Sequence, residues 1–134
     1  MSIIEQDQPK PEKSSRPHFL FVDDDLPILE LFEKFFSKNA AVSLAKDGVD
    51  ALGKITGQFY DAIISDVDMP VLNGMDLFRC LHAEDPCIAE RFVFCTGHPS
   101  AELERFCATH QVRCITKPVS LAALQKELTE LCQN

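Results

Sequence analysis

Short, uninterrupted apolar runs recur along this chain, and each of them stops at a polar residue. Four of the runs end at Asp23, Asp66, Thr96 and Lys117. Runs of this length, separated by helix-length amphipathic segments, are typical of buried parallel strands joined by crossover helices. Because the carboxyl ends of parallel strands lie at one edge of a sheet, we expect the polar residues that follow them to share a pocket.

The alternation predicts an α/β fold of five strand–helix units. The predicted strands are 18–22, 41–45, 61–65, 91–95 and 112–116, and the predicted helices are 26–38, 48–56, 74–84, 100–109 and 119–132. Apolar residues at three- and four-residue spacing indicate the helices. For the first helix they are Ile28, Phe32, Phe35 and Phe36. Packing of this stripe against the sheet is favoured over docking of a partner.

The chain divides into a tail and one domain. Residues 1–17 are polar and interrupted by prolines, so we expect a flexible N-terminal tail, followed by a domain over 18–134. At 134 residues and 46% hydrophobic residues, the chain is long enough for one core that buries roughly two-thirds of the unfolded surface. Nothing follows Asn134 that could serve as an output module, so the domain is expected to stand alone.

Charge and composition exclude several classes of protein. Thirteen basic against 21 acidic side chains give a net charge of −8, which argues against binding to nucleic acid or to an anionic membrane. The N-terminus lacks a signal-peptide core, and no apolar stretch approaches the roughly 18 residues of a membrane helix, so we expect a cytoplasmic protein. The six cysteines show neither C-x-x-C nor zinc spacing and are interpreted as reduced thiols in or near the core.

The acidic residues at the strand ends predict a cation site. If Asp23, Asp24 and Asp66 meet, each pair at about 4 Å repels by about 4 kcal/mol at an effective dielectric constant of 20. One lysine cannot neutralise three carboxylates, whereas Mg²⁺ together with Lys117 can. A phosphoryl group would complete such a site, with Lys117 and Thr96 contacting its oxygens. Asp25, in contrast, is interpreted as a helix cap.

Four short motifs carry a resemblance to a known family. They are Val22-Asp23-Asp24, Asp66-Val67-Asp68-Met69-Pro70 followed by Gly74, Thr96-Gly97, and Lys117-Pro118. In this order and spacing they resemble the signature of the receiver domain of two-component response regulators, over residues 18–132. The resemblance implies a flavodoxin-like, doubly wound (βα)₅ fold with a five-stranded parallel sheet in the order 2-1-3-4-5.

The resemblance also implies a reaction. A sensor histidine kinase or a histidine phosphotransfer protein would donate a phosphoryl group from phosphohistidine to Asp66, which is therefore the modified residue. Asp66, Thr96 and Lys117 would be the catalytic residues. The ligands implied for Mg²⁺ are Asp23, Asp24, Asp66 and the backbone carbonyl of Asp68. Beyond its own phosphorylation and dephosphorylation, the domain is not expected to be an enzyme.

The implied output is a phosphorylation-dependent switch. Phosphorylation would move the loop after Thr96 and the neighbouring helix, as a signalling switch or a phosphorelay intermediate read by a downstream protein target. A phosphorylation-dependent dimer through that helix and the following strand is a further implication. Cys114 is the switch position where the family usually carries Tyr or Phe, so the usual coupling to an aromatic ring is absent. Asp68 and His98 occupy the flanking positions that tune the rates in receivers.

Two other functions stay open at this stage. One is a receiver-shaped interaction module that is never phosphorylated, for which the substitution at Cys114 leaves room. The other is a haloacid dehalogenase-like phosphatase, because Asp23 and Asp25 form a D-x-D pair after the first strand. Against the phosphatase, Pro27 stands where that family has Thr or Val, and no acidic pair follows Lys117.

Overall fold

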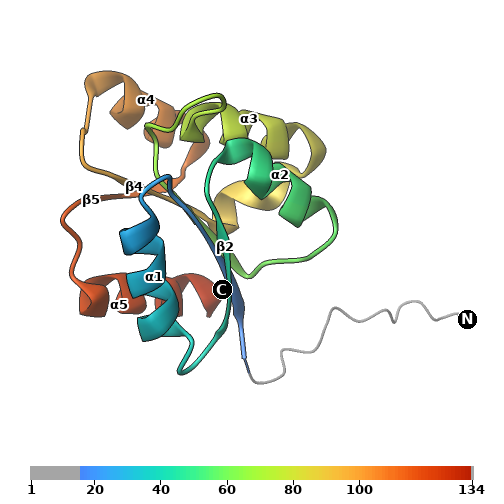
Figure 1. Cartoon of the computed structure of the whole chain (residues 1–134). Coiled ribbons are helices and arrows are strands. Elements are labelled where there is room, and N and C mark those ends of the chain that lie inside the picture. The colour runs from blue at the N-terminus through green and yellow to red at the C-terminus, as the bar shows by residue number, and fades with distance from the viewer. Residues whose placement is uncertain (1–15, 134) are drawn as a thin grey trace, which may run out of the picture.

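The chain folds into one parallel sheet with helices on both faces, as the computed structural model of residues 16–133 shows (Figure 1). The strand order is β2-β1-β3-β4-β5, and every neighbouring pair is parallel. This arrangement confirms the predicted fold class and the order 2-1-3-4-5. Of the predicted tail, residues 1–15 lie outside the described part of the chain.

The elements follow the predicted alternation closely. The strands are β1 (His18–Val22), β2 (Ala41–Ala45), β3 (Ala62–Ser65), β4 (Phe92–Thr96) and β5 (Arg113–Thr116). The α-helices are α1 (Leu26–Phe36), α2 (Gly48–Thr56), α3 (Gly74–Glu84), α4 (Ala101–His110) and α5 (Leu121–Cys132). The 3₁₀ helix η2 (Pro86–Arg91), which lies between α3 and β4, was not predicted. Its proline-initiated turn is too short to show the helical period in the sequence.

The two faces of the sheet bury separate apolar clusters. One contains Phe21, Phe32 and Leu128, and it joins α1 and α5 to the sheet. The other contains Leu20, Leu77 and Leu103, and it joins α3 and α4 to the opposite face, where α2 also packs. Because both faces are covered, the strands read as continuous apolar runs rather than alternating ones.

Each α-helix begins at a polar side chain that accepts a backbone N–H of the first turn. The capping residues are Asp25, Asp47, Asn73, Ser100 and Ser120. The interpretation of Asp25 as a cap is therefore confirmed, since its side chain accepts from the Ile28 N–H. Asp25 is the second acid of the D-x-D pair on which the phosphatase alternative depended, and its side chain is thus used as a helix cap.

The expectation about the cysteines needs correction. Among the described residues no disulfide joins the cysteines, as expected, but Cys80, Cys87 and Cys114 are exposed, and only Cys95 is fully buried. These exposed cysteines lie on solvent-facing positions of helix or edge strand that the apolar pattern did not distinguish. The first stripe packs against the sheet as predicted, because Phe32 and Phe36 are buried and the half-buried Ile28 and Phe35 pack against the same cluster.

The strand register places the predicted site at one edge of the sheet. Val22 of β1 lies opposite Ser65 of β3, so Asp23 and Asp66 follow them side by side. Between β4 and β5, Thr96 lies opposite Thr116, and Lys117 follows Thr116 directly. Within the part of the chain that the structure describes, no helix is long and apolar enough to cross a membrane.

Gly74 lets α3 begin against the backbone that carries Asp66. A Cβ atom at Gly74 would lie 2.3 Å from the Asp66 carbonyl oxygen and 3.0 Å from the Val67 Cα, both backbone atoms that cannot rotate away. Gly53 on α2 offers the matched contrast, because a Cβ there would meet nothing within 4 Å. The glycine at the start of α3 is therefore required by close packing.

We predict opposite stability changes for two glycine-to-alanine substitutions. Gly74→Ala should lower the free energy of unfolding by about 2 kcal/mol or more, because the loop that carries Asp66 must shift. Gly53→Ala should raise it by about 0.5–1 kcal/mol, because alanine favours the helix. Urea unfolding followed by circular dichroism measures both. Equal effects of the two substitutions would contradict the packing role of Gly74.

Candidate functional site

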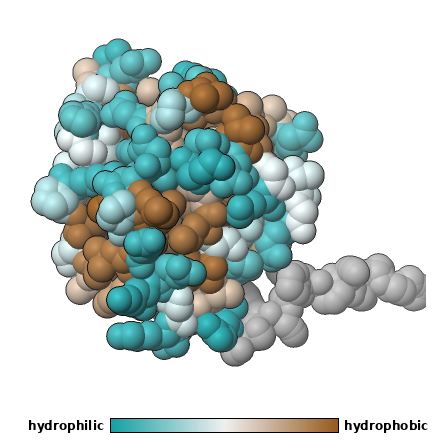
Figure 2. All heavy atoms as spheres, in the orientation of Figure 1, coloured by the Kyte–Doolittle hydropathy of each residue, from teal (hydrophilic) through white to brown (hydrophobic). Residues whose placement is uncertain are grey.

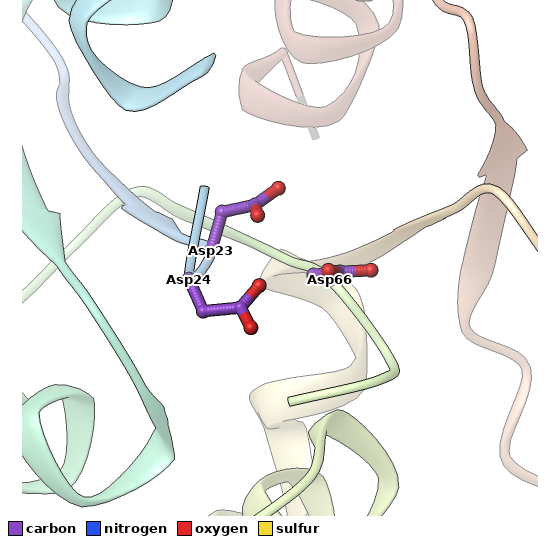
Figure 3. Close-up of side chains that lie close together, drawn as sticks. All are labelled: Asp23, Asp24 and Asp66. Atoms are coloured by element: carbon purple, nitrogen blue, oxygen red, sulfur yellow. The ribbon is translucent and has the colours of Figure 1, made fainter. Parts of the chain in front are cut away.

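Three carboxylates gather where β1 and β3 end (Figure 3). Asp23 and Asp24 follow β1 and Asp66 follows β3, and one oxygen of each side chain lies within 4.8 Å of the others. Asp23 and Asp66 are 4% and 9% exposed, whereas Asp24 faces solvent. The structure thus brings together the three side chains that the sequence predicted as a cation site.

Lys117 enters this cluster from the end of β5. Its Nζ donates to Asp23 Oδ2 at 2.9 Å and lies 3.6 Å from Asp66 Oδ2. Its backbone N–H donates to the Thr96 carbonyl at 2.7 Å, which fixes the residue beside β4. Burial alone would lower the pKa of Lys117, but the hydrogen bond to Asp23 and the charges of Asp23 and Asp66 outweigh it and raise that pKa. The lysine is therefore positively charged at neutral pH.

Asp66 is held by hydrogen bonds of both its backbone and its side chain. Its backbone N–H donates to the Val22 carbonyl at 2.9 Å, and its Oδ1 accepts the Val67 N–H at 2.8 Å. Burial, followed by the negative charge of Asp23, raises the pKa of Asp66 against the opposing influence of Lys117 and the Val67 N–H. One buried carboxylate is thus held in a fixed orientation although its charge is disfavoured.

Thr96 lies at the end of β4 and is fully buried. Its Oγ1 accepts the backbone N–H of His98 at 3.0 Å, so the hydroxyl hydrogen stays available for donation. The hydrogen bond also ties the start of the loop after β4 to the strand end. Thr96 occupies the strand end beside the acids and Lys117, as the sequence predicted.

Asp68 and His98, which lie two residues after Asp66 and Thr96 respectively, contact each other. His98 Nδ1 lies 3.5 Å from Asp68 Oδ2, and the two side chains are 87% and 65% exposed, respectively. The Asp68 carboxylate is therefore directed to the loop after β4, and it does not belong to the three-carboxylate cluster. The expected metal contact of Asp68 uses its backbone carbonyl and stays a prediction.

One contact next to the expected switch position was not predicted. Cys114, on β5, is exposed, and its thiol lies close enough to that of Cys107 on α4 for each to shift the other's pKa. Sequence reasoning placed the two cysteines on different elements and had no signal for the pairing. Position 114 carries a cysteine and no aromatic ring.

The donor set suits a hard divalent cation. The side-chain donors are all carboxylate oxygens, and two of the three acids are buried with one lysine, which leaves a net negative charge. All-oxygen sites of this kind favour Mg²⁺ over the softer transition metals. Among residues 16–133, these three acids are the one group of His, Cys, Asp or Glu side chains that lie close enough together to hold a metal ion. The residues present therefore fit the expected ion.

Comparisons with known proteins agree on one family. The family described as response regulator receiver domain matches residues 19–129. The sensor protein EvgS of Escherichia coli K12 is 33% identical over 69% of this chain and 8% of its own length. The transcriptional regulatory protein PrrA of Mycobacterium leprae is 40% identical over 53% of this chain and 31% of its own length. The chain thus spans less than a third of these curated relatives.

Solved structures give the same picture. A CheY-like response regulator receiver domain protein from Methanospirillum hungatei superposes with a TM-score of 0.82 at 26% identity, over 89% of this chain and 95% of that chain. The chemotaxis protein CheY4 of Vibrio cholerae gives a TM-score of 0.78 at 25% identity, over 87% and 99%. In these comparisons the likeness extends over nearly the whole domain.

The carboxylate cluster makes a prediction about stability in the absence of divalent cations. Asp66→Asn should raise the free energy of unfolding at pH 7 by about 1 kcal/mol, because it removes a buried charge that repels Asp23. A carboxyl group whose pKa is raised by folding binds a proton more tightly in the folded state than in the unfolded state. Its negative charge therefore lowers the free energy of unfolding above the raised pKa, and this penalty is lost as the pH falls through that pKa. The gain should therefore shrink on acidification.

Urea unfolding in EDTA across a pH series measures this difference. Asp25→Asn is the matched control, because asparagine caps a helix as well as aspartate does and Asp25 lies outside the cluster. It should leave stability unchanged within about 0.5 kcal/mol. A loss of stability in Asp66→Asn at pH 7 would mean that repulsion does not dominate the site.

Proposed function

This chain belongs to the response regulator receiver family, and on that premise we propose that Asp66 accepts a phosphoryl group from a phosphohistidine. The donor would be a sensor histidine kinase or a histidine phosphotransfer protein. The single observation that carries the proposal is the position of Asp66. It is buried, its Oδ1 is held by the Val67 N–H, and its Oδ2 lies 3.6 Å from Lys117 Nζ.

In the proposed reaction, an Asp66 carboxylate oxygen forms a bond to phosphorus while the phosphorus–nitrogen bond of the donor breaks. The electron pair of the broken bond stays on the imidazole nitrogen. Lys117, already within reach of Asp66, pairs with a phosphoryl oxygen, and the Thr96 hydroxyl donates to another. Positioning and charge compensation by these groups are the main requirements of phosphoryl transfer.

We further propose that the site uses Mg²⁺. Asp23, Asp24 and Asp66 would hold the ion, together with the Asp68 backbone carbonyl. When bound, Mg²⁺ neutralises the negative charge that carboxylates and phosphoryl oxygens accumulate in one place. The support for this proposal is the excess of carboxylates over cations among the described residues at the site.

The same proposal includes how the signal leaves the domain. The His98 N–H donates to Thr96 Oγ1, so a Thr96 side chain that moved to donate its hydroxyl hydrogen to a phosphoryl group would shift the loop around Gly97 and His98. With Cys114 in place of an aromatic residue, this loop and α4 carry the change to a downstream target. We propose that the domain acts in the cytoplasm as a signalling switch or phosphorelay intermediate, and a phosphorylation-dependent dimer through α4 and β5 belongs to the same proposal.

The surface around the site suits a protein donor. Leu26, at the start of α1, is 58% exposed, and Val71, in the loop after Asp66, is 89% exposed. Leu31, further along α1, is 47% exposed, and apolar side chains gather among polar ones on the side of the molecule where α1 lies (Figure 2). A donor protein that delivers its histidine to Asp66 would cover the surface that carries these exposed apolar side chains, and apolar contacts there would help to bind the donor.

We predict that acetyl phosphate adds one phosphoryl group, about 80 Da, to the wild-type chain in the presence of Mg²⁺. Intact-mass spectrometry after rapid quench measures the gain. Asp66→Asn should abolish it because the accepting oxygen is lost, while Asp25→Asn should leave it intact.

Failure to gain mass, with Mg²⁺ binding shown by titration, would support the interaction module in place of the receiver reaction. Repeated turnover of a phosphomonoester that needs Asp23 and Asp25 but tolerates Asp66→Asn would support a phosphatase instead. Each outcome therefore selects one of the three functions.

Asp68 yields a second kinetic prediction. Its exposed carboxylate borders the site and repels an anionic donor, so Asp68→Asn should speed phosphorylation by acetyl phosphate roughly two- to threefold at low salt. The gain should fade at about 0.5 M salt, because exposed charges are screened. Glu130→Gln, near the C-terminal end of α5 and away from the strand ends that carry the site, removes an equal charge and should leave the rate unchanged. An equal acceleration in both variants would show that only net charge matters.

A further inference from the structure

Two cysteines from different elements meet on the side of the sheet covered by α4. Cys107 lies in the last turns of α4, and Cys114 is the second residue of β5. Gln111, with φ of 58°, turns the chain between them, and the Val112 N–H donates to the Cys107 carbonyl at 3.0 Å. This tight turn brings the two side chains together, close enough for the thiols to shift each other's pKa.

The two thiols differ in access and acidity. Cys114 is exposed, whereas Cys107 is half-buried and packs against the core cluster under α4. Burial raises the pKa of Cys107 to about 12. Burial also raises the pKa of Cys114, but the hydrogen bond from Cys107 partly offsets that effect. Cys114 is therefore the thiol that solvent reaches and that ionises first, and Cys107 lies directly behind it.

We propose that Cys107 and Cys114 form a redox modification site, at which a peroxide converts the thiol pair into a disulfide that ties α4 to β5. The proposal does not depend on phosphorylation of Asp66. It rests on the contact between the thiols, on the solvent exposure of Cys114, and on the turn that holds the two elements together.

Hydrogen peroxide is the only oxidant that this reaction needs. The Cys114 thiolate sulfur attacks one peroxide oxygen, so that a sulfur–oxygen bond forms, the oxygen–oxygen bond breaks and hydroxide leaves. The Cys107 sulfur then attacks the Cys114 sulfenic sulfur and loses its proton, and water leaves as the sulfur–sulfur bond forms. Two thiols are oxidised to one disulfide, and the peroxide is reduced to two waters. A small dithiol reverses the change.

The location gives the modification a consequence for the domain. Helix α4 follows the loop that begins at Thr96, and β5 leads directly to Lys117. A covalent link near the end of α4 would restrict movement of that helix relative to β5. Oxidation would thus act on the two elements through which we propose that phosphorylation is transmitted, without touching the carboxylates.

The test is a peptide map after treatment of the wild-type chain with hydrogen peroxide. Trypsin cleaves after Arg105, Arg113 and Lys126 and spares the Lys117–Pro118 bond, so peptides 106–113 and 114–126 each carry one cysteine of the pair. We expect these two peptides to be cross-linked in a monomeric product that is about 2 Da lighter and that dithiothreitol restores. The rate should rise roughly tenfold per pH unit below the thiol pKa, because the thiolate reacts.

Matched variants separate the pair from general cysteine oxidation. Cys114→Ser should abolish the link, whereas Cys87→Ser, which removes another exposed cysteine, should leave it unchanged. Peroxide adducts at Cys107 and Cys114 without loss of mass, or links that join other cysteines, would overturn the proposal. Because the wild-type map is decisive by itself, the test holds even if a variant folds poorly.

Discussion

The ion pair between Lys117 and Asp23 is the interaction on which the site depends. It joins residues at the ends of β5 and β1, which β3 and β4 separate in the sheet, with a 2.9 Å contact between Nζ and Oδ2. Asp23 is 4% exposed, so its charge would be costly without a partner. Lys117 also lies 3.6 Å from Asp66 Oδ2, but one lysine leaves the three carboxylates with a net negative charge. A divalent cation would neutralise this residual charge, which would otherwise repel an anionic phosphoryl group.

Much of this arrangement could be predicted because it depends on strand ends. Apolar runs located the strands, and in a parallel sheet their carboxyl ends converge, so Asp23, Asp66 and Lys117 had to lie near one another. The strand order itself came from the family resemblance, since apolar pattern alone does not specify which strands are neighbours. Element boundaries moved by one or two residues, as at α1, because helix ends depend on caps and local turns.

The contacts that the sequence did not reveal all cross between elements. Asp68 and His98 were expected to flank the site, yet their mutual contact depends on how two loops approach one another. The pairing of Cys107 with Cys114 depends on the turn at Gln111, which adopts a left-handed conformation that a glutamine seldom takes. Such contacts follow from side-chain direction and loop geometry, and hydrophobic periodicity carries information on neither.

The loop after Asp66 shows how the fold holds an unfavourable charge in place. Val71 has φ of 69°, a conformation that a β-branched residue rarely adopts, and its side chain is 89% exposed. The Gly74 N–H donates to the Val67 carbonyl at 2.8 Å, and Asp66 is anchored to β1 at its other end. Because both ends of the loop are fixed, strain at Val71 cannot relax by moving Asp66. Backbone strain at Val71 thus accompanies the fixed position of the buried Asp66 carboxylate.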